Sequence, residues 1–380
     1  MYIDYILSQF RRNAMSKNLG ALPDSLLQNL VDAGFIKGAS SRHIGPASLD
    51  LCISSEVYRV NGMFQPRIGE TIRSLIERLD VRPHPAGAQF EREVVYLARL
   101  NESLTLPHNV FGYCNPKSST GRHDVHVRVL ADGVPRYDTV SPEGFSGELW
   151  VTIIPRSYPV IIPEGEPISQ LRLINAKTRL SEEETEIAFS RWKLLYTLAG
   201  ESISYGDVQI RDGDGSVILT LDLESEIAGY EYTGHQRILD FTQGKKAYDA
   251  QDFFEPIKVY DDHIYLRRGG FYILSTAEAV RVPPGLACEM VAMDEKSGEF
   301  RSHYAGFIDP GWGYGKDGEG KGRPLTLEVR PFEDLVIFKN HPIAKIMFEQ
   351  MTNVPDLHYD QKAECNYGNQ SGPKLAKHFK

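Results

Sequence analysis

The sequence is poor in cysteine, and its cysteines form no closely spaced pairs. Its 380 residues include only Cys52, Cys114, Cys288 and Cys365. A zinc ribbon requires CxxC pairs, and a disulfide scaffold requires a higher cysteine content, so the sequence excludes both classes. We therefore expect a reduced, cytoplasmic protein.

The sequence also lacks a surplus of positive charge and a long hydrophobic run. Its 42 Lys and Arg residues against 51 Asp and Glu residues give a net charge of -9, which argues against a basic nucleic-acid-binding surface. No apolar run approaches the roughly 20 residues that a membrane helix needs. The first residues resemble no signal peptide. We expect neither a nucleic-acid nor a membrane partner.

The local patterns predict a mainly β protein with a few short helices. Residues 1–40 have a helical pattern, in which Pro23-Asp24-Ser25 begins one helix and Gly34 ends it. A second helix is expected over 182–198, behind a capping box that begins at Ser181. Elsewhere short β-branched and aromatic runs alternate with turn residues, as in 93–100 and 149–154.

The sequence contains an internal repeat. The segment from Tyr96 to Pro107 aligns with the segment from Tyr272 to Pro283, 176 residues later. Further matches keep this offset within one residue: Pro155 with Pro331, Val160 with Val336, and Glu166-Pro167-Ile168 with His341-Pro342-Ile343. A whole domain is therefore predicted to be duplicated, giving two tandem β-barrel domains over residues 1–199 and 200–380.

The first candidate site is Asn115-Pro116-Lys117-Ser118-Ser119-Thr120-Gly121-Arg122. Small hydroxyl residues and glycine let backbone N–H groups approach an anion, and the lysine and arginine add positive charge. The segment has no GxxxxGK[ST] motif and is not a P-loop. A surface turn flanked by ordinary cations fits the spacing equally well.

A second candidate site combines the turn from Gly306 to Trp312 with the strand from Leu325 to Val329. Glu328 would lie among apolar neighbours there, which favours proton exchange near neutral pH. A surface salt bridge is the alternative role for this glutamate. Two tail segments, 358–360 and 367–373, would either fold over a ligand or form a disordered terminus.

Taken together, these segments resemble the dCTP deaminase family, which shares the fold of the trimeric dUTPases. The matching motifs are PASLDLCIS (46–54), NPKSSTGR (115–122), GFSGELWV (144–151), IDPGW (308–312), LTLE (325–328) and YGNQSGP (367–373). Each motif alone is weak, whereas the full set is specific and covers nearly the whole chain. The double-length arrangement is similar to a bacterial branch of that family.

In the first copy the resemblance assigns phosphate binding to Lys117, Ser118, Ser119 and Arg122, and places Ala131 in the hairpin that covers the base. The family's catalytic glutamate should lie five residues after Gly147, where this copy has Thr152. Threonine cannot do the acid–base work of a carboxylate. This copy alone therefore looks unable to deaminate.

The second copy is the complement of the first. The resemblance makes Glu328 the catalytic glutamate, and it assigns substrate contacts to Asp309, Thr326, Tyr359 and Gln370. Asn366 replaces a lysine that the family often has. The phosphate loop is eroded: Ser297 and Arg301 remain, but Glu299 stands between them and would repel phosphate.

The resemblance implies hydrolytic deamination of dCTP, in which Glu328 shuttles protons while Ser118 and Arg122 position the reacting groups. Mg²⁺ would bind through the substrate triphosphate. No zinc is expected, because the HxE…PCxxC signature of the zinc deaminases is missing. In this fold, active sites form where barrels meet, so we expect a homo-oligomer.

Two questions stay open at the level of sequence. The active site either combines residues of both copies, or consists of the second copy alone with Ser297, Arg301 and Glu328. The chain is also compatible with a dUTP diphosphatase, because Asp309 matches the water-activating aspartate of dUTPases. A bifunctional deaminase–diphosphatase, or a non-catalytic nucleotide-binding regulator, completes the alternatives, with dUTP or dTTP as product or inhibitor.

Overall fold

The structure is a computed structural model that describes residues 19–208, 210–293, 300–302, 306–362, 367–368 and 370–380, with the backbone alone for 300–302. The chain divides into two compact units, and each is described here by itself. The first unit runs to Thr178 and includes Gln236–Gly244 and Met351–Asp356. The second comprises Arg179–His235, Lys245–Gln350 and Leu357–Lys380.

This division differs from the predicted boundary between residues 199 and 200. Residues 179–199 belong to the second unit, because Ala188, Phe189, Leu194 and Leu195 are part of its hydrophobic core. Gln236–Gly244 in turn belongs to the first unit, where β15 (Leu239–Asp240) pairs in parallel with β9 (Val160–Ile161). Neither exchange leaves a mark in the sequence pattern.

Both predicted helices are present. The first ends at Asp32, and Gly34 follows its C-cap in a left-handed conformation (φ 76°), as predicted, whereas the second ends earlier than expected. Lys193 stops the second of them in a left-handed conformation (φ 52°), and Leu195–Thr197 then forms strand β11, so the prediction of helix to 198 was wrong. Its capping box between Ser181 and Glu184 is confirmed. The four α-helices of the described chain are α2 (Asp24–Asp32), α3 (Ile72–Arg78), α4 (Ser118–Gly121) and α5 (Glu182–Trp192).

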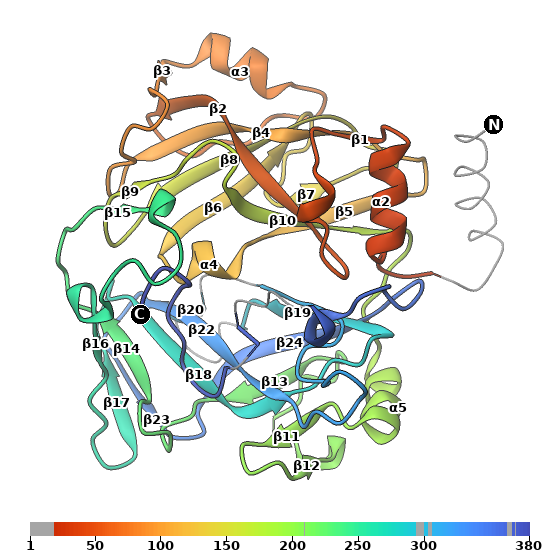
Figure 1. Ribbon diagram of the computed structural model, residues 1–380, viewed down its shortest axis with the longest axis vertical. Coiled ribbons are helices and arrows are strands. Elements are labelled where there is room, and N and C mark those ends of the chain that lie inside the picture. The colour runs from red at the N-terminus through yellow and green to blue at the C-terminus, as the bar shows by residue number, and fades with distance from the viewer. Residues whose placement is uncertain (1–18, 209, 294–299, 303–305, 363–366, 369) are drawn as a thin grey trace. The chain divides into compact units, whose positions relative to one another are not determined.

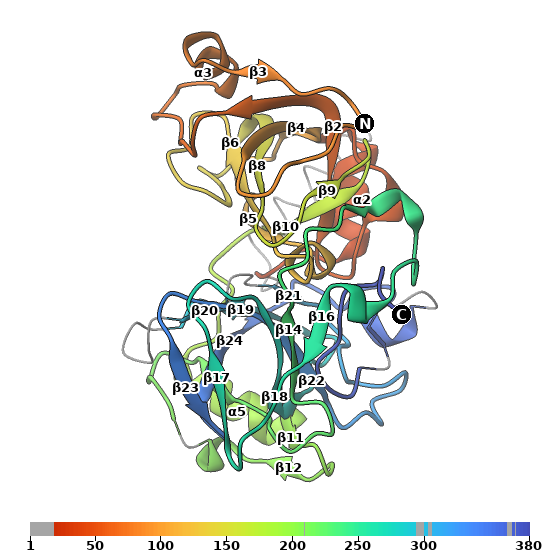
Figure 2. The ribbon, with the colours of Figure 1, turned by 90° about the vertical axis from the view of Figure 1, so that its left-hand side faces the viewer.

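The first unit is built on a nine-stranded antiparallel sheet, in the order β6-β8-β4-β2-β10-β5-β7, with β1 paired to β4 and β3 to β2. Figure 1 and, from the side, Figure 2 show these strands curling around an interior. The strands are β1 (Ile36–Lys37), β2 (Leu49–Val60), β3 (Arg82–Pro83), β4 (Val95–Thr105), β5 (Phe111–Pro116), β6 (Val125–Ala131), β7 (Thr139–Val140), β8 (Ser146–Pro155) and β10 (Pro167–Ile174).

The second unit distributes its strands over three sheets. A seven-stranded sheet contains β12-β11-β18-β14-β16 with β22 and β20, a four-stranded sheet has the order β13-β24-β19-β21, and β17 pairs with β23. The strands are β11 (Leu195–Thr197), β12 (Ser202–Ile203), β13 (Val217–Thr220), β14 (Gly229–Tyr232), β16 (Phe254–Pro256), β17 (His263–Leu266), β18 (Tyr272–Val280), β19 (Leu286–Val291), β20 (Phe300–Ser302), β21 (Phe307–Ile308), β22 (Arg323–Pro331), β23 (Leu335–Phe338) and β24 (Pro342–Gln350).

The two units repeat each other strand by strand, which confirms the prediction of two tandem β-barrel domains. The order β6-β8-β4-β2-β10-β5-β7 recurs as β20-β22-β18-β14 and β13-β24-β19-β21, with β2 split into β13 and β14. The register recurs as well. Leu97 lies opposite Thr152 in the first unit, and Ile273 lies opposite Glu328 in the second.

Equivalent tyrosine hydroxyls accept equivalent backbone hydrogen bonds in the two copies, which supports the same duplication. The hydroxyl of Tyr96 accepts a hydrogen bond from the backbone N–H of Glu91 at 2.9 Å. The hydroxyl of Tyr272, 176 residues later, accepts one from the N–H of Arg267 at 2.7 Å. Because both members of each pair keep the offset, the two copies have retained local geometry and not merely similar strands.

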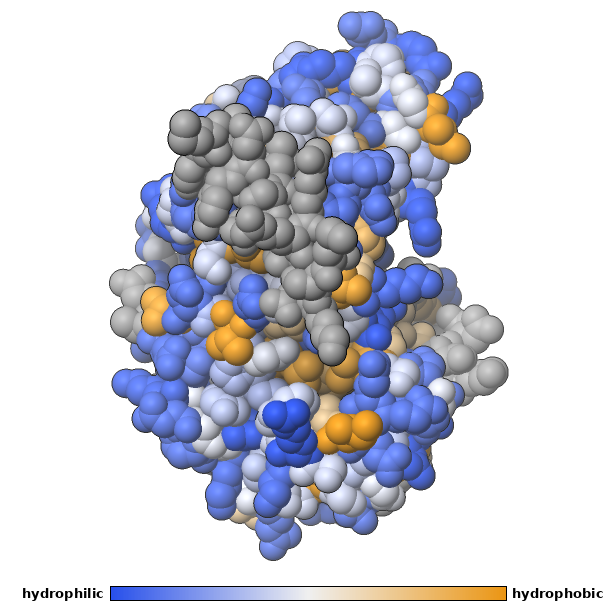
Figure 3. Space-filling view, turned by 90° about the vertical axis from the view of Figure 1, so that its right-hand side faces the viewer, coloured by the Kyte–Doolittle hydropathy of each residue, from blue (hydrophilic) through white to orange (hydrophobic). Residues whose placement is uncertain are grey.

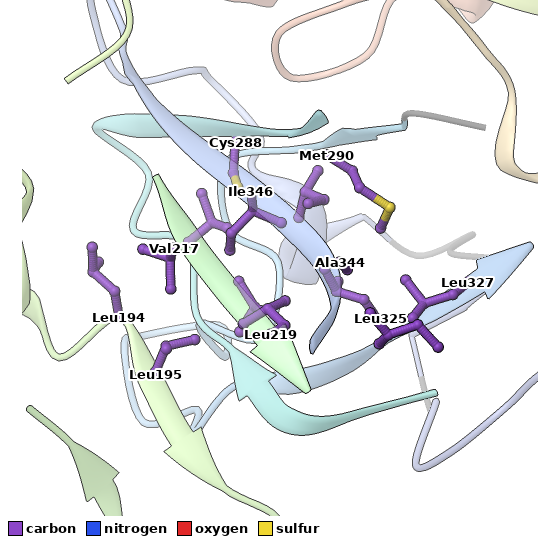
Figure 4. Packing of buried hydrophobic residues seen from close by; sticks show 14 of the residues in the cluster. Leu194, Leu195, Val217, Leu219, Cys288, Met290, Leu325, Leu327, Ala344 and Ile346 are labelled. Atoms are coloured by element: carbon purple, nitrogen blue, oxygen red, sulfur yellow. The ribbon is translucent and has the colours of Figure 1, made fainter. Parts of the chain in front are cut away.

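The core of the second unit lies on one side of β22. Leu325, Leu327 and Val329 point into a cluster that also contains Leu219, Ala344 and Ile346, and several of these side chains meet in Figure 4. Since side chains alternate along a strand, Thr326 and Glu328 point to the opposite face. The strand therefore has one hydrophobic face, toward the core, and one polar face on the other side.

The equivalent face of the first unit is filled by a hydrophobic layer. Trp150 and Thr152 stand at the positions of Thr326 and Glu328, and both are fully buried. Trp150 packs with Leu97 and Leu130 and with Ile72 and Leu75 from α3. Figure 1 shows α3 beside β3, outside the sheet. This helix was not predicted, and it covers the face that remains polar in the second unit.

Hydrophilic residues dominate the face of the molecule shown in Figure 3, with hydrophobic ones in small groups. Among the described residues, no helix combines the length and the apolar character that a membrane crossing requires.

We expect Trp150→Ala to lower the free energy of unfolding by about 3–5 kcal/mol, the usual cost of truncating a fully buried tryptophan. Denaturant unfolding followed by far-UV circular dichroism measures this loss. Phe338→Ala is the control, because Phe338 is 51% exposed and should cost about 1 kcal/mol or less. Equal losses for the two variants would show that the hydrophobic layer around Trp150 does not stabilise the first unit.

Candidate active site

The predicted phosphate motif of the first copy forms a tight turn at the end of β5. Lys117 has an extended backbone (φ −67°, ψ 144°), and α4 begins at the next residue. The N–H of Gly121 donates to the carbonyl of Lys117 at 3.0 Å, and the N–H of Arg122 donates to that of Ser118 at 3.0 Å. These bonds bring all four motif residues into one turn.

Within the first unit, one charged side chain of this motif is in an ion pair and the other is buried. The Lys117 ammonium contacts the Asp50 carboxylate on β2 in an ion pair. Arg122 is 4% exposed, and Ser119 is also buried. The sequence did not predict Asp50 as a partner, because it lies 67 residues before Lys117. The ion pair with Asp50 orients the Lys117 side chain, and the carboxylate offsets the positive charge of its ammonium.

Two residues directly after the motif anchor it to the loop that follows β8. His123 is hydrogen-bonded through Nδ1 to the hydroxyl of Tyr158 at 3.0 Å. Asp124 Oδ2 accepts a hydrogen bond from Ser157 Oγ at 2.6 Å, and the backbone of Asp124 is left-handed (φ 53°). Sequence reasoning missed both residues, although they adjoin Arg122. A buried His-Asp pair at the end of a motif is the signal that could have found them.

The remaining positions of the first copy carry no acid–base group. Ala131 ends β6 and is fully buried. The Thr152 hydroxyl donates to the carbonyl of Arg128 at 3.3 Å across the sheet. Trp150 packs beside it, and the one carboxylate on this face of β8, that of Glu148, is paired with Arg73 of α3 at 2.8 Å. The position of Thr152 itself has no acid–base group.

In the second copy, Glu328 and Thr326 lie on the polar face of β22, and they are 4% and 6% exposed. The tail of the chain crosses this strand. The Gln370 amide donates through Nε2 to the carbonyl of Pro324 at 2.8 Å, and the N–H of Lys374 donates to Thr326 Oγ1 at 3.3 Å. The described tail residues therefore pack against the strand that carries the predicted catalytic glutamate.

The turn that contains Asp309 is joined to the same tail. The N–H of Tyr359 donates to the carbonyl of Pro310 at 2.8 Å, and the Tyr359 ring lies 5.1 Å from the Trp312 ring. Gly311 is required here, because its φ is 88° and an added Cβ would lie 2.3 Å from His358 Nδ1. The fold thus brings Tyr359 beside the Asp309 turn, and Gln370 beside Pro324 at the start of β22.

An ion pair between Arg323 and Asp360 also joins the tail to the start of β22. Asp360 Oδ1 accepts a hydrogen bond from Arg323 Nη1 at 2.9 Å, and its Oδ2 accepts one from the N–H of Gly315 at 2.9 Å. Arg323 also lies over the Trp312 ring, 5.0 Å from its centroid. These residues tie the first residue of β22 to the tail, and sequence reasoning did not single them out.

The register identifies the counterpart of Asp309, which the sequence comparison missed. Gly112 pairs with Val140, and Cys288 pairs with Ile308. Gly112 and Cys288 are 176 residues apart, whereas Val140 and Ile308 are 168 apart. Ser141-Pro142 is therefore the equivalent of Asp309-Pro310. The first copy has lost both predicted acids of the site, with Ser141 and Thr152 in their places.

Several predicted features lie outside the described residues. These are the side chains of the eroded loop with Ser297, Glu299 and Arg301, together with Asn366 of the tail.

Comparison with known proteins identifies the family. The model of the 2'-deoxycytidine 5'-triphosphate deaminase (DCD) N-terminal domain matches residues 18–177, and that of the C-terminal domain matches residues 196–379. No curated protein matches the chain. Among solved structures, 2'-deoxycytidine 5'-triphosphate deaminase from Agrobacterium tumefaciens is 32% identical, with a TM-score of 0.80 over 90% of this chain and 100% of that one. The chain belongs to the 2'-deoxycytidine 5'-triphosphate deaminase family.

Proposed function

We propose that the protein hydrolyses dCTP to dUTP and ammonia in pyrimidine deoxynucleotide synthesis in the cytoplasm, with Glu328 as the catalytic acid–base. The observation that carries this proposal is the buried carboxylate of Glu328 on the polar face of β22, next to Thr326 and under the tail. A glutamate side chain can both accept and donate a proton, which suits a group that must take a proton from water and return it.

In the proposed reaction, Glu328 takes a proton from the attacking water, and the resulting hydroxide adds to C4 of cytosine. Glu328 then passes that proton to N3 of the ring, takes the proton of the new C4 hydroxyl and gives it to the amine. The C4–N bond breaks, ammonia leaves, and the C4 carbonyl of uracil remains. Ser118 orients the water or the exocyclic amine, and Arg122 holds Ser118 and stabilises charge nearby. Asp309, Thr326 and Ala131 position the nucleoside.

The triphosphate is proposed to bind Lys117, Ser119, Tyr359 and Gln370, and it carries Mg²⁺ as its counter-ion. We propose no protein ligand for this ion. We also propose that the chemical step needs no zinc, since the sequence lacks the signature that activates water in zinc deaminases. The working form is proposed to be a homo-oligomer, with dUTP or dTTP as product or inhibitor.

We expect Glu328→Gln to abolish deamination while leaving dCTP binding nearly unchanged. Glutamine keeps the size of the side chain but cannot carry a proton, and losing a general acid–base costs roughly 10²–10⁴-fold in kcat. Steady-state kinetics and equilibrium binding separate the two effects.

Thr152→Val is the matched control, because Thr152 occupies the same register position in the first copy. Its kcat should stay within a few-fold of the natural protein. Comparable losses in both variants would show that the catalytic copy has been misassigned.

We further propose that one reaction uses residues of both copies, because one retains the phosphate motif and the other the glutamate. Arg122→Ala should then reduce kcat/KM by about 10²-fold or more, as removal of a transition-state contact does. Arg122→Lys, which keeps the charge, controls for misfolding. Lys117→Ala should mainly raise KM, since a phosphate contact acts equally in the ground and transition states.

Arg301→Ala decides between this proposal and a self-contained second copy. The eroded loop carries Glu299, which would repel the triphosphate, so this variant should remain close to natural activity. An inactive Arg301→Ala together with a normal Arg122→Ala would make the first copy a structural partner only.

Product analysis separates deamination from the rival activities. We expect dCTP to give dUTP and ammonia in equal amounts, measured by ion-pair chromatography and an ammonia assay. Both acids that a bifunctional enzyme would need, Asp309 and Glu328, are present in the second copy. Accumulation of dUMP and pyrophosphate would therefore indicate a bifunctional deaminase–diphosphatase, and tight binding without turnover would indicate a regulator.

A further inference from the structure

A cluster in the first unit has no place in the proposed reaction. His43, Cys52 and Glu102 each offer one ligand atom, and the three atoms lie within 4.8 Å of one another. His43 is held by the turn η1 (Ser41–His43), whereas Cys52 and Glu102 lie on β2 and β4. Cys52 Sγ is 3.2 Å from His43 Nδ1.

The second copy provides an internal comparison for this cluster. Glu278 is the repeat equivalent of Glu102. Thr220 is the equivalent of Cys52, because Thr220 pairs with Pro342 and Cys52 pairs with the matching proline, Pro167. Thr220 satisfies both carboxylate oxygens of Glu278, through its backbone N–H at 2.8 Å and its hydroxyl at 2.7 Å. In that copy the carboxylate is explained fully by hydrogen bonds.

In the first copy the same carboxylate is only half satisfied. The N–H of Cys52 donates to Glu102 Oε2 at 3.0 Å. Glu102 is 1% exposed, and its Oε1 is buried with no conventional hydrogen-bond partner among the described residues. The hydroxyl of the second copy is replaced by a thiol, which is a weak donor and a strong ligand for soft metals.

We propose that His43 Nδ1, Cys52 Sγ and Glu102 Oε1 bind a thiophilic divalent cation, with Zn²⁺ as the expected ion. A tetrahedral zinc site places ligand atoms about 2.0–2.3 Å from the ion, and hence roughly 3–4 Å from each other, close to the observed spacing. A thiolate and a carboxylate together balance the charge of the ion. Three protein ligands leave one position for water.

The surroundings of the cluster are compatible with such an ion. Lys117, the nearby cation, is paired with Asp50, two residues before Cys52 on β2. Burial raises the pKa of Glu102 to about 7 and that of the Cys52 thiol to about 12, so these groups are costly to ionise without a counter-charge. Arg42 donates to His43 Nε2 at 3.2 Å in an exposed contact, which metal binding at Nδ1 would replace.

The sequence did not predict this site, because its ligands are separated by 9 and 50 residues and form no recognised spacing. The proposed site is independent of catalysis. It would stabilise the pairing of β2 with β4, without taking part in the reaction.

The test measures metal content in full-length protein without a histidine tag. After incubation with Zn²⁺ or Co²⁺ and gel filtration, elemental analysis should find about one ion per chain, as a single set of three protein ligands implies. The cobalt form should show thiolate-to-metal charge-transfer absorption. A natural protein that retains neither ion in a stoichiometric amount would overturn the proposal.

Cys52→Thr is the sharpest variant, because it reproduces the Thr220–Glu278 arrangement and removes the sulfur ligand. It should fold, and its metal content should fall at least tenfold. Thermal unfolding with and without Zn²⁺ should shift for the natural protein and not for this variant. Unchanged metal content in Cys52→Thr would contradict the site.

Two further variants keep the test decisive. His43→Gln changes a half-buried residue of the η1 turn and should also lose the metal, even if Cys52→Thr fails to fold. Cys114→Ala removes a buried cysteine outside the cluster and should keep the metal. Loss of metal in Cys114→Ala but not in His43→Gln would place the ion elsewhere. Deamination by the chelated protein is a separate test, which bears on the proposed function alone.

Discussion

The antiparallel register between β18 and β22 is the constraint on which the rest of the site depends. It places Ile273 opposite Glu328 and, through the alternation of side chains along a strand, sends Leu325, Leu327 and Val329 into the core. A shift of one residue would exchange the two faces, burying the carboxylate in the core and exposing leucine. The hydrophobic core of the second unit therefore fixes the position of the proposed catalytic group.

The first unit has the same strand register, but different residues cover the equivalent strand face. Leu97 lies opposite Thr152, and the face that carries Glu328 in the other copy is covered by Trp150 and α3. The second copy instead places the tail of the chain there, through Gln370 and Lys374. The strands are therefore the same in the two copies, while the elements that cover this face differ: α3 in the first copy and the tail in the second.

The sequence was sufficient to predict features that depend on local or periodic patterns. These include the duplication, the mainly β class, and the helices that begin at Asp24 and Glu182. It did not reveal α3, which packs on Trp150 through Ile72 and Leu75. It also did not reveal the Ser141 counterpart of Asp309, because the offset there falls from 176 to 168. The Lys117–Asp50 pair and the His43–Cys52–Glu102 cluster were equally hidden, since strand pairing joins residues that are distant in sequence.

Of the two equivalent strand faces, only that of β22 in the second copy is proposed to receive the base of the substrate. A crystal structure of the Glu328→Gln protein with dCTP tests this. We expect cytosine against residue 328 and Thr326, with Trp150 still packed under α3 in the first copy. Cytosine bound on the β8 face in place of that hydrophobic layer, or at a position remote from residue 328, would contradict it.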